Sequence, residues 1–305
     1  MTMTALETWH LSKVIKGCPV LDDISLEVPR GGVFALLGPE GSGKGAFLKI
    51  ILGVEAPTSG GGLCLGLDIL TRGVQIREKV GFTGQATRYY GYMPVARLLK
   101  FCRGFYPQWD EALAAKILKQ FDLPLSAKIR ELPPEAQQGL GLALALAPRP
   151  DLLLLDRPTE GFDPVRRRLY YDLAREEMNS RGGTIVISSA TLDEVSNVAD
   201  QAALLHRGRL LYAGPMAGLR PAAREIRVVF QKEPQDLPFH HPGISRVRRE
   251  KNAYIVTVTE NLEEIWQKIA ALPHYALELD DSGLEGLISR FAKEERKSGT
   301  VLPLR

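Results

Sequence analysis

Residues 33–46, VFALLGPEGSGKGA, decide the fold of this chain. An all-apolar run, Val33 to Leu37, precedes a glycine-rich turn, and helical spacing begins at Lys44. All-apolar runs are typical of strands that are buried on both faces of a parallel sheet. Such a turn directs successive backbone N–H groups and a helix N-terminus toward one point, where the Lys44 ammonium group can join them. The segment therefore predicts a strand, a phosphate-binding loop and a helix.

A glycine-rich turn that only reverses the chain is the alternative, and the strand, the spacing and the lysine together disfavour it. The loop predicts a nucleotide-binding site. Its predicted binding residues are Gly38, Pro39, Glu40, Gly41, Ser42, Gly43, Lys44, Gly45 and Ala46.

Two further apolar runs, DLLLLD (151–156) and TIVIS (184–188), have the same strand character, so the fold class is α/β. Helical spacing over 94–121 and 134–147 indicates a helical insertion, at about 86–147, between strands of the sheet. Asp163 and Pro164 predict the start of a later helix. Its expected apolar stripe consists of Val165, Leu169 and Leu173.

The pattern changes after Pro215, which indicates a second domain. The segments that follow read as strands at 225–230, 244–248 and 253–258, and as helices at 262–269 and 284–291. We expect a nucleotide-binding domain over residues 1–220 and a small α+β domain over residues 221–305. The second domain has no motif to which we can assign chemistry.

The composition is that of a globular protein: 305 residues, 45% hydrophobic, 25% charged, with a net charge of +3. Disordered, collagen-like and disulfide-framework classes are disfavoured, and three scattered cysteines suit a reducing compartment. The near-neutral charge gives little support for a nucleic-acid partner. The start of the chain lacks a signal peptide, and no apolar run approaches the roughly 20 residues that cross a bilayer. We expect a cytoplasmic protein whose membrane role, if it has one, depends on a partner.

Further motifs follow the phosphate loop in a fixed order. They are Gln85 in VGFTGQ, Asp156 at the end of LLLLD, residues 160–163 (EGFD) and residues 188–190 (SSA). With these landmarks, residues 8–215 resemble the ATP-binding subunits of ABC transporters. In that family they are the Q-loop, the Walker B aspartate, the D-loop and the switch.

The segments FYPQWD (105–110) and LLHRGRLLYAG (204–214) resemble the subgroup that serves bacterial antibiotic and multidrug exporters. The resemblance implies a P-loop NTPase fold and binding of ATP with Mg²⁺. It also implies integral membrane permease subunits as partners, and a peripheral position on the inner face of the cell membrane.

The metal site departs from the family pattern. In the family, a Ser or Thr follows the P-loop lysine and its hydroxyl binds Mg²⁺, but here the residue is Gly45. Because Mg²⁺ requires near-octahedral oxygen coordination, one protein ligand is replaced by water. The resemblance leaves Gln85 and Asp156 as Mg²⁺ ligands, and we expect the metal to bind weakly.

The catalytic positions depart further. Arg157 occupies the position of the glutamate that polarises water in the family, and a guanidinium has no lone pair with which to accept a proton. We expect Arg157 to pair with Asp156 or with a γ-phosphate, unless it is a solvent-facing arginine without a role. Ala190 occupies the position of the switch histidine, and a methyl group forms no hydrogen bond.

Two further family positions are altered. The aromatic residue that stacks on adenine corresponds to Ile15; an ordinary core contact is expected for it, and less specific packing on the base is the alternative. The signature loop, LSGGQ in the family, falls on Leu132-Pro133-Pro134-Glu135-Ala136. Two prolines remove backbone donors and Glu135 adds negative charge, so this loop should repel a phosphate.

Subunits of the family close head to tail, so each ATP lies between one P-loop and the opposite signature. The resemblance therefore implies an ATP-binding subunit without its own hydrolytic machinery, in a heterodimer with a competent homologue. A nucleotide-independent regulator or scaffold of the same complex is the alternative. A soluble ATPase of translation or DNA repair is disfavoured, because such proteins fuse two nucleotide domains or carry long coiled coils.

Overall fold

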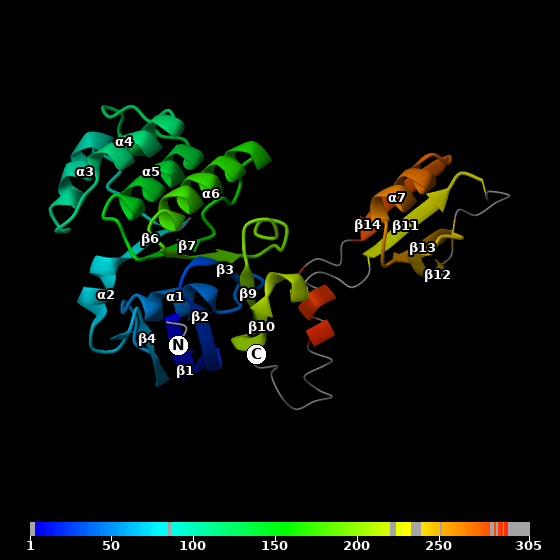
Figure 1. Cartoon of the computed structure of the whole chain (residues 1–305), viewed down its shortest axis with the longest axis horizontal. Helices are drawn as coiled ribbons and strands as arrows, with labels where there is room; N and C mark the ends of the chain where they lie inside the picture. The colour runs from blue at the N-terminus through cyan, green and yellow to red at the C-terminus, as the bar shows by residue number, and fades with distance from the viewer. Residues whose placement is uncertain are drawn as a thin grey trace. The chain divides into compact units, whose positions relative to one another are not determined.

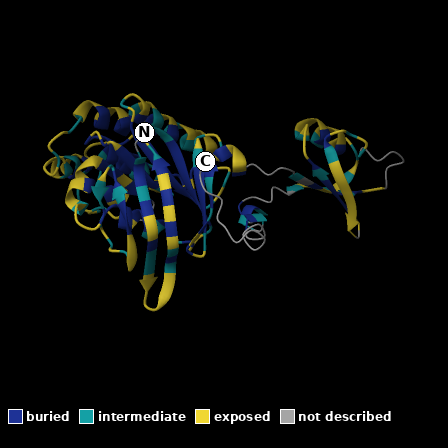
Figure 2. Cartoon of the chain, turned by 60° about the horizontal axis from the view of Figure 1, so that its bottom comes forward, coloured by how far each residue is buried: buried dark blue, intermediate teal, exposed yellow. Residues whose placement is uncertain are grey.

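The computed structural model describes residues 4–84, 87–219, 224–232, 239–250, 252–280, 284, 286–288 and 290–291. The described chain divides into two compact units, with the boundary between Met216 and Ala217 in the sequence. Each unit encloses its own buried residues, and exposed residues lie on its surface (Figure 2).

The apolar runs form the central sheet of the first unit. Its strands lie in the order β10 (Arg209–Pro215), β9 (Gln201–His206), β3 (Gly32–Leu37), β8 (Thr184–Ser189), β7 (Leu152–Asp156), β6 (Val80–Gly84). All neighbouring pairs are parallel except β9 and β10. The expected α/β class is confirmed. Parallel strands bring the ends of β3, β7 and β8 to one edge of the sheet, where β3 leads into the phosphate loop.

A second, antiparallel sheet packs below the central one (Figure 1). Its order is β2 (Cys18–Pro29), β1 (Thr4–Ile15), β4 (Ser59–Cys64), β5 (Leu67–Asp68). Helix α1 (Lys44–Ile51) lies between the sheets, and Phe47 and Ile51 of this helix join Leu36 and Leu154 in one buried core. The short helix α2 (Gly73–Lys79) precedes β6.

Helices cover the other face of the central sheet (Figure 1). They are α3 (Val95–Arg103), α4 (Glu111–Gln120), a 3₁₀ turn (Ile129–Glu131), α5 (Pro134–Leu146) and α6 (Pro164–Asn179). The segment expected to be helical over 94–121 is two helices, because the chain turns at Gly104 and Asp110 caps a new helix at Leu113 N.

The apolar stripe expected on α6 is wrong in detail. Leu173 is buried as expected, but Val165 is 78% exposed, and Tyr170, Ala174 and Met178 are buried instead. Both sets have helical spacing, so the spacing does not choose between them. Packing chooses, because the Tyr170 ring meets the edges of Phe121 and Phe162.

The second unit is an antiparallel sheet with one helix. Its strands, in the order β12 (Ile244–Glu250), β13 (Ala253–Val258), β11 (Arg224–Phe230), β14 (His274–Asp280), pack with α7 (Leu262–Ala270) around Ile226, Val256 and Ile265. The three predicted strands and the first predicted helix are present. Strand β14 was not predicted, although Leu277 and Leu279 alternate as a half-buried strand would. A 3₁₀ turn, Met216–Leu219, precedes the unit's first strand.

Candidate functional site

The phosphate loop leaves the end of β3 in a conformation that requires glycine at two positions. A Cβ at Gly38 would lie 2.3 Å from the backbone oxygen of Leu205, and a Cβ at Gly43 would lie 2.6 Å from that of Val20. Gly43 also has φ +105, which disfavours other residues. The loop can therefore approach its neighbours closely and curl into a cradle before α1 begins.

Lys44 lies inside this cradle. Its side chain is buried, and Nζ donates to Gly38 O at 2.5 Å, Pro39 O at 3.0 Å and the Ser42 hydroxyl at 3.3 Å. Burial, followed by the nearby positive charge of Arg157, lowers the pKa of Lys44 to about 8. At neutral pH the ammonium group therefore carries its charge toward an anion.

The loop and the end of β7 enclose a cavity of about 280 Å³. A cavity of this size, with backbone donors and a lysine, suits a phosphate group. The structure thus brings together two segments that lie far apart in the sequence. The lining residues are Val20, Glu40, Gly41, Ser42, Gly43, Lys44, Gly45, Ala46, Asp156 and Arg157.

Asp156 ends β7 at the floor of this cavity. Its Oδ1 accepts a hydrogen bond from the Ser188 hydroxyl at the end of β8. A Cβ built on Gly45 would lie 3.7 Å from Asp156 Oδ2, which is an ordinary contact. A Ser or Thr side chain would therefore fit at position 45, so steric exclusion does not explain why the residue there is glycine.

The position after Lys44 supplies no side-chain oxygen for a Mg²⁺ ion. Asp156 supplies a carboxylate, Gly45 supplies no side-chain oxygen, and Arg157 adds a positive charge to the same cavity. Gln85, the other expected ligand, lies outside the described residues. Within the described part of the chain, no group of three or more His, Cys, Asp or Glu side chains gathers as a metal site.

Arg157, directly after β7, also lines the cavity. Its Nη1 is 3.4 Å from a Glu40 carboxylate oxygen and 3.5 Å from one of Glu160. Asp156, the partner expected from the sequence, is instead bonded to Ser188. Because Glu40 is 85% exposed, the pair is worth only about 0–1 kcal/mol. Arg157 has φ +49, and its backbone N–H donates to Ser188 O at 3.1 Å.

A buried network connects the switch segment to α6, and sequence reasoning missed it. Glu194 accepts hydrogen bonds from the hydroxyls of Thr159, Ser189 and Tyr171, the last at 3.2 Å. Burial, then the charge of Glu194, raises the pKa of Tyr171 well above its usual value, so it remains a phenol that can donate. The sequence signal that could have indicated this network is the carboxylate of Glu194, which follows the buried strand β8 by a few residues. Ala190, between these groups, does not line the phosphate cavity.

The segment at the signature position lies at the start of α5. Pro133 precedes the helix and Pro134 is its first residue. Glu135 lies 3.8 Å from Arg166 of α6, so its negative charge has a counter-ion that the sequence did not predict. Ile15 is exposed at the end of β1, next to the Lys16-Gly17 turn, and the expected core contact is wrong.

The chain is similar in sequence to known ATP-binding proteins of ABC transporters. A family model described as ABC transporter matches residues 21–160. The chain is 34% identical over 216 residues to the probable multidrug ABC transporter ATP-binding protein YbhF of Escherichia coli. This alignment covers 69% of this chain and 37% of the relative. The chain thus spans little more than a third of that relative.

Other relatives are covered more fully. The daunorubicin/doxorubicin resistance ATP-binding protein DrrA of Streptomyces peucetius is 31% identical over 71% of this chain and 67% of its own length. The ABC transporter ATP-binding protein YtrB of Bacillus subtilis is 28% identical over 85% of this chain and 88% of its own.

Solved structures share the fold. An ATP-binding subunit of an ABC transporter superposes with a TM-score of 0.64 at 24% identity, covering 71% of this chain and 92% of that one. A dimeric ATP-binding cassette, solved in a post-hydrolysis state with ADP and phosphate, superposes with a TM-score of 0.63 at 20% identity, over 69% and 98%.

Proposed function

Because the chain belongs to the ABC transporter family of ATP-binding proteins, we propose that it is an exporter subunit that binds ATP and does not hydrolyse it alone. The single observation that carries the proposal is the composition of the phosphate cavity. A buried lysine and a glycine-rich loop face a guanidinium where the family has a carboxylate base. The cavity can hold a phosphate group, but a guanidinium cannot accept a proton from water.

The proposed catalytic loss extends beyond Arg157. Ala190 offers no hydrogen bond at the switch position, and Pro133 and Pro134 remove donors from the signature position. A homodimer would then lack the base and the switch at both sites. We therefore propose a heterodimer with a competent homologue, whose own base and phosphate loop act at the second composite site.

Docking on membrane subunits is the second part of the proposal. None of the helices in the described chain has the length and hydropathy of a membrane span. An exposed aromatic cluster at the start of the helical region offers a surface for a permease. It consists of Tyr90, Tyr92, Phe101 and Phe105, linked by ring contacts of 5.1–6.3 Å.

A nucleotide-independent scaffold is the second candidate. The observation that favours it is that Lys44 already directs its Nζ donors to acceptors in its own loop. In that case the loop would be held closed without a ligand.

The purified chain tests the proposal. We expect ATP to raise its unfolding temperature and to give measurable heat on titration, because a ligand that binds only the native state stabilises it by about 2.7 kcal/mol at one hundred times its Kd. We expect no release of inorganic phosphate above the background of a Lys44→Ala preparation.

Lys49→Ala is the matched control, because this lysine lies on the same helix and is exposed, with Glu55 as its partner. Lys44→Ala should abolish the thermal shift and Lys49→Ala should keep it. Absence of any shift at millimolar ATP would favour the scaffold. If the lone chain releases phosphate, and Lys44→Ala abolishes this release, the proposal is overturned. Purification of the complex from native membranes would identify the permease and the second ATPase.

A further inference from the structure

Two cationic side chains, Lys44 and Arg157, line the cavity of the phosphate loop. Lys44 comes from the start of α1, and Arg157 follows directly after β7. The anionic groups beside them are Asp156, which is bonded to Ser188, and Glu40, which is paired with Arg157. The cavity therefore contains one more cation than a phosphate loop by itself would supply.

The additional cation, Arg157, lies in the same cavity as Gly45, the position that lacks the side-chain oxygen ligand for Mg²⁺. A nucleotide triphosphate carries several negative charges, which proteins of this kind commonly balance with a lysine and a divalent ion. Here Gly45 supplies no side-chain oxygen for Mg²⁺, and the positive charge of Arg157 disfavours a second cation in the cavity. A guanidinium offers a fixed fork of N–H donors that matches phosphate oxygens, and it remains charged at any physiological pH.

The contacts of Arg157 show how it would reach a phosphate. Its side chain is 28% exposed and is held near the cavity by Glu40 and Glu160, which lie on the two loops that flank it. Glu40 is exposed and its pair with Arg157 is long, so a phosphate can displace this carboxylate at little cost. The left-handed backbone at Arg157, φ +49, is uncommon for a residue with a side chain.

We propose that Arg157 is a phosphate-binding residue that takes the place of the divalent cation, so that this cradle binds ATP without Mg²⁺. Glu40 occupies the guanidinium until the nucleotide displaces it. The inference rests on the proposed function, because it requires the cradle to bind ATP.

Calorimetric titration of the full-length chain with ATP, once in EDTA and once in excess Mg²⁺, tests the proposal. We expect binding of the wild type in both buffers. Arg157→Gln should weaken binding in EDTA at least about tenfold, the usual value of a charge-assisted hydrogen bond. Arg157→Lys, which keeps the charge, should recover part of this loss. Glu40→Gln should tighten binding by up to about fivefold, because it removes the competing anion.

Arg168→Gln is the matched control, since this arginine is highly exposed and pairs with Asp172 on α6, away from the cavity. Thermal unfolding without nucleotide checks that every variant folds, and Arg157→Asn is the second variant because Asn tolerates a left-handed backbone. Binding of ATP only in Mg²⁺, or an Arg157→Gln chain that binds like Arg168→Gln, would overturn this inference and leave the proposed function intact. A folded wild type that binds no ATP in either buffer would overturn both.

Discussion

Lys44 combines burial with a second positive charge nearby, and this combination governs its protonation. Burial is the larger cause and Arg157 the next, and together they lower its pKa from 10.5 to about 8. An unfolded chain therefore binds more protons than the folded chain between these two pH values. The contribution of Lys44 to stability is lowest below about pH 8 and rises from there to about pH 10.5.

The affinity for ATP should have the opposite dependence on pH. The charged ammonium group binds phosphate, and a bound phosphate raises the pKa of Lys44 again, so binding above pH 8 should be accompanied by proton uptake. We expect affinity to fall as pH rises from about 8 to 9. Titrations at about pH 9 in buffers of different ionisation enthalpy should give different apparent heats. The same heat in every buffer would contradict the prediction.

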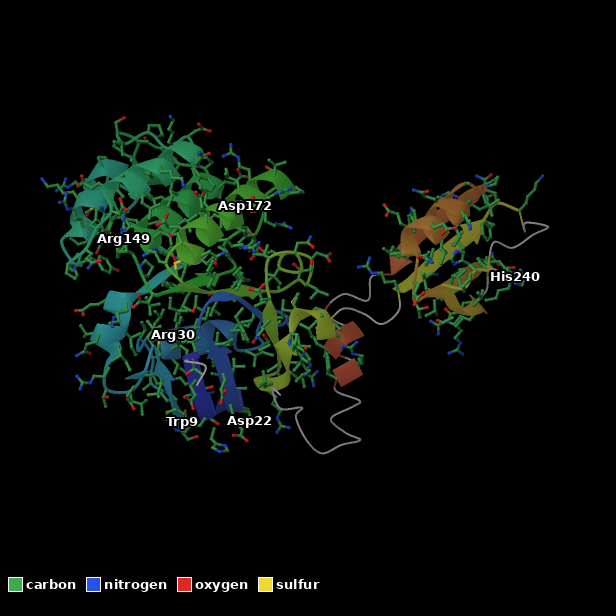
Figure 3. All side chains as sticks on the ribbon, viewed as in Figure 1. Trp9, Asp22, Arg30, Arg149, Asp172 and His240 are labelled. Atoms are coloured by element: carbon green, nitrogen blue, oxygen red, sulfur yellow. The ribbon has the colours of Figure 1, made fainter. Side chains whose placement is uncertain are left out.

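At the scale of the element, Asp110 connects α4 to the segment before β7. Its side chain accepts from Leu113 N at 2.9 Å, which caps the helix, and pairs with Arg149 at 2.5 Å (Figure 3 labels Arg149). The backbone hydrogen bond from Leu113 is the largest cause that lowers the pKa of Asp110, and the hydrogen bond from Arg149 is the next. Because the folded pKa lies below the unfolded one, this stabilisation is present at neutral pH and is lost as the carboxylate is protonated.

Asp110→Ala should lower the free energy of unfolding by about 1 kcal/mol at pH 7, the usual cost of a lost N-cap. Urea unfolding measures it. The difference from the wild type should shrink as the pH falls below the usual range of a carboxyl. Asp172→Ala is the control, because Asp172 is an exposed carboxylate within α6 and not at its start (Figure 3). An equal loss in both variants would contradict the role of the cap.

Hydrogen bonds also connect the end of β8, at the switch position, to neighbouring elements. Glu194 joins the end of β8 to Tyr171 of α6 and to Thr159, which precedes the D-loop. The backbone oxygen of Ser189 in turn accepts from Gly38 N at 3.2 Å, so the same strand end contacts the phosphate loop. The phosphate loop and α6 are therefore connected through one series of hydrogen bonds.

At the scale of the whole molecule, each compact unit has its own core. Leu36, Phe47 and Leu154 lie in the core of the first unit, and Val228, Val256 and Ile269 lie in that of the second. All residues that line the phosphate cavity belong to the first unit. A unit with its own core can fold by itself.

A chain that ends at Met216 should therefore fold and bind ATP with an affinity like that of the full chain. Calorimetric titration with ATP measures the affinity, and circular dichroism measures the fold. We expect any unfolding transition that belongs to the second unit to disappear from the melting curve. A shortened chain that folds and no longer binds ATP would contradict the prediction and show that residues 217–305 contribute to ATP binding.

The sequence by itself determined the strand, the loop and the helix around Lys44, because local spacing and residue type specify these elements. It also determined that Gly45 lacks an oxygen ligand and that Arg157 lacks a lone pair, since these are properties of the residues themselves. The α/β class followed from the apolar runs, and the second unit's first strands followed from their alternation. Strand β14 was missed, although its alternation was present.

Only the tertiary structure decided which side chains pair with one another. Arg157 and Glu40 are 117 residues apart in the chain, and Thr159 and Glu194 are 35 apart. No local pattern specifies which carboxylate faces which cation. Likewise, helical spacing on α6 does not decide between Val165, which is exposed, and Tyr170, which is buried; the rings of Phe121 and Phe162, which pack against Tyr170, decide it. Contacts between distant segments form only when the sheet brings them together, and they complete the cradle that the phosphate loop begins.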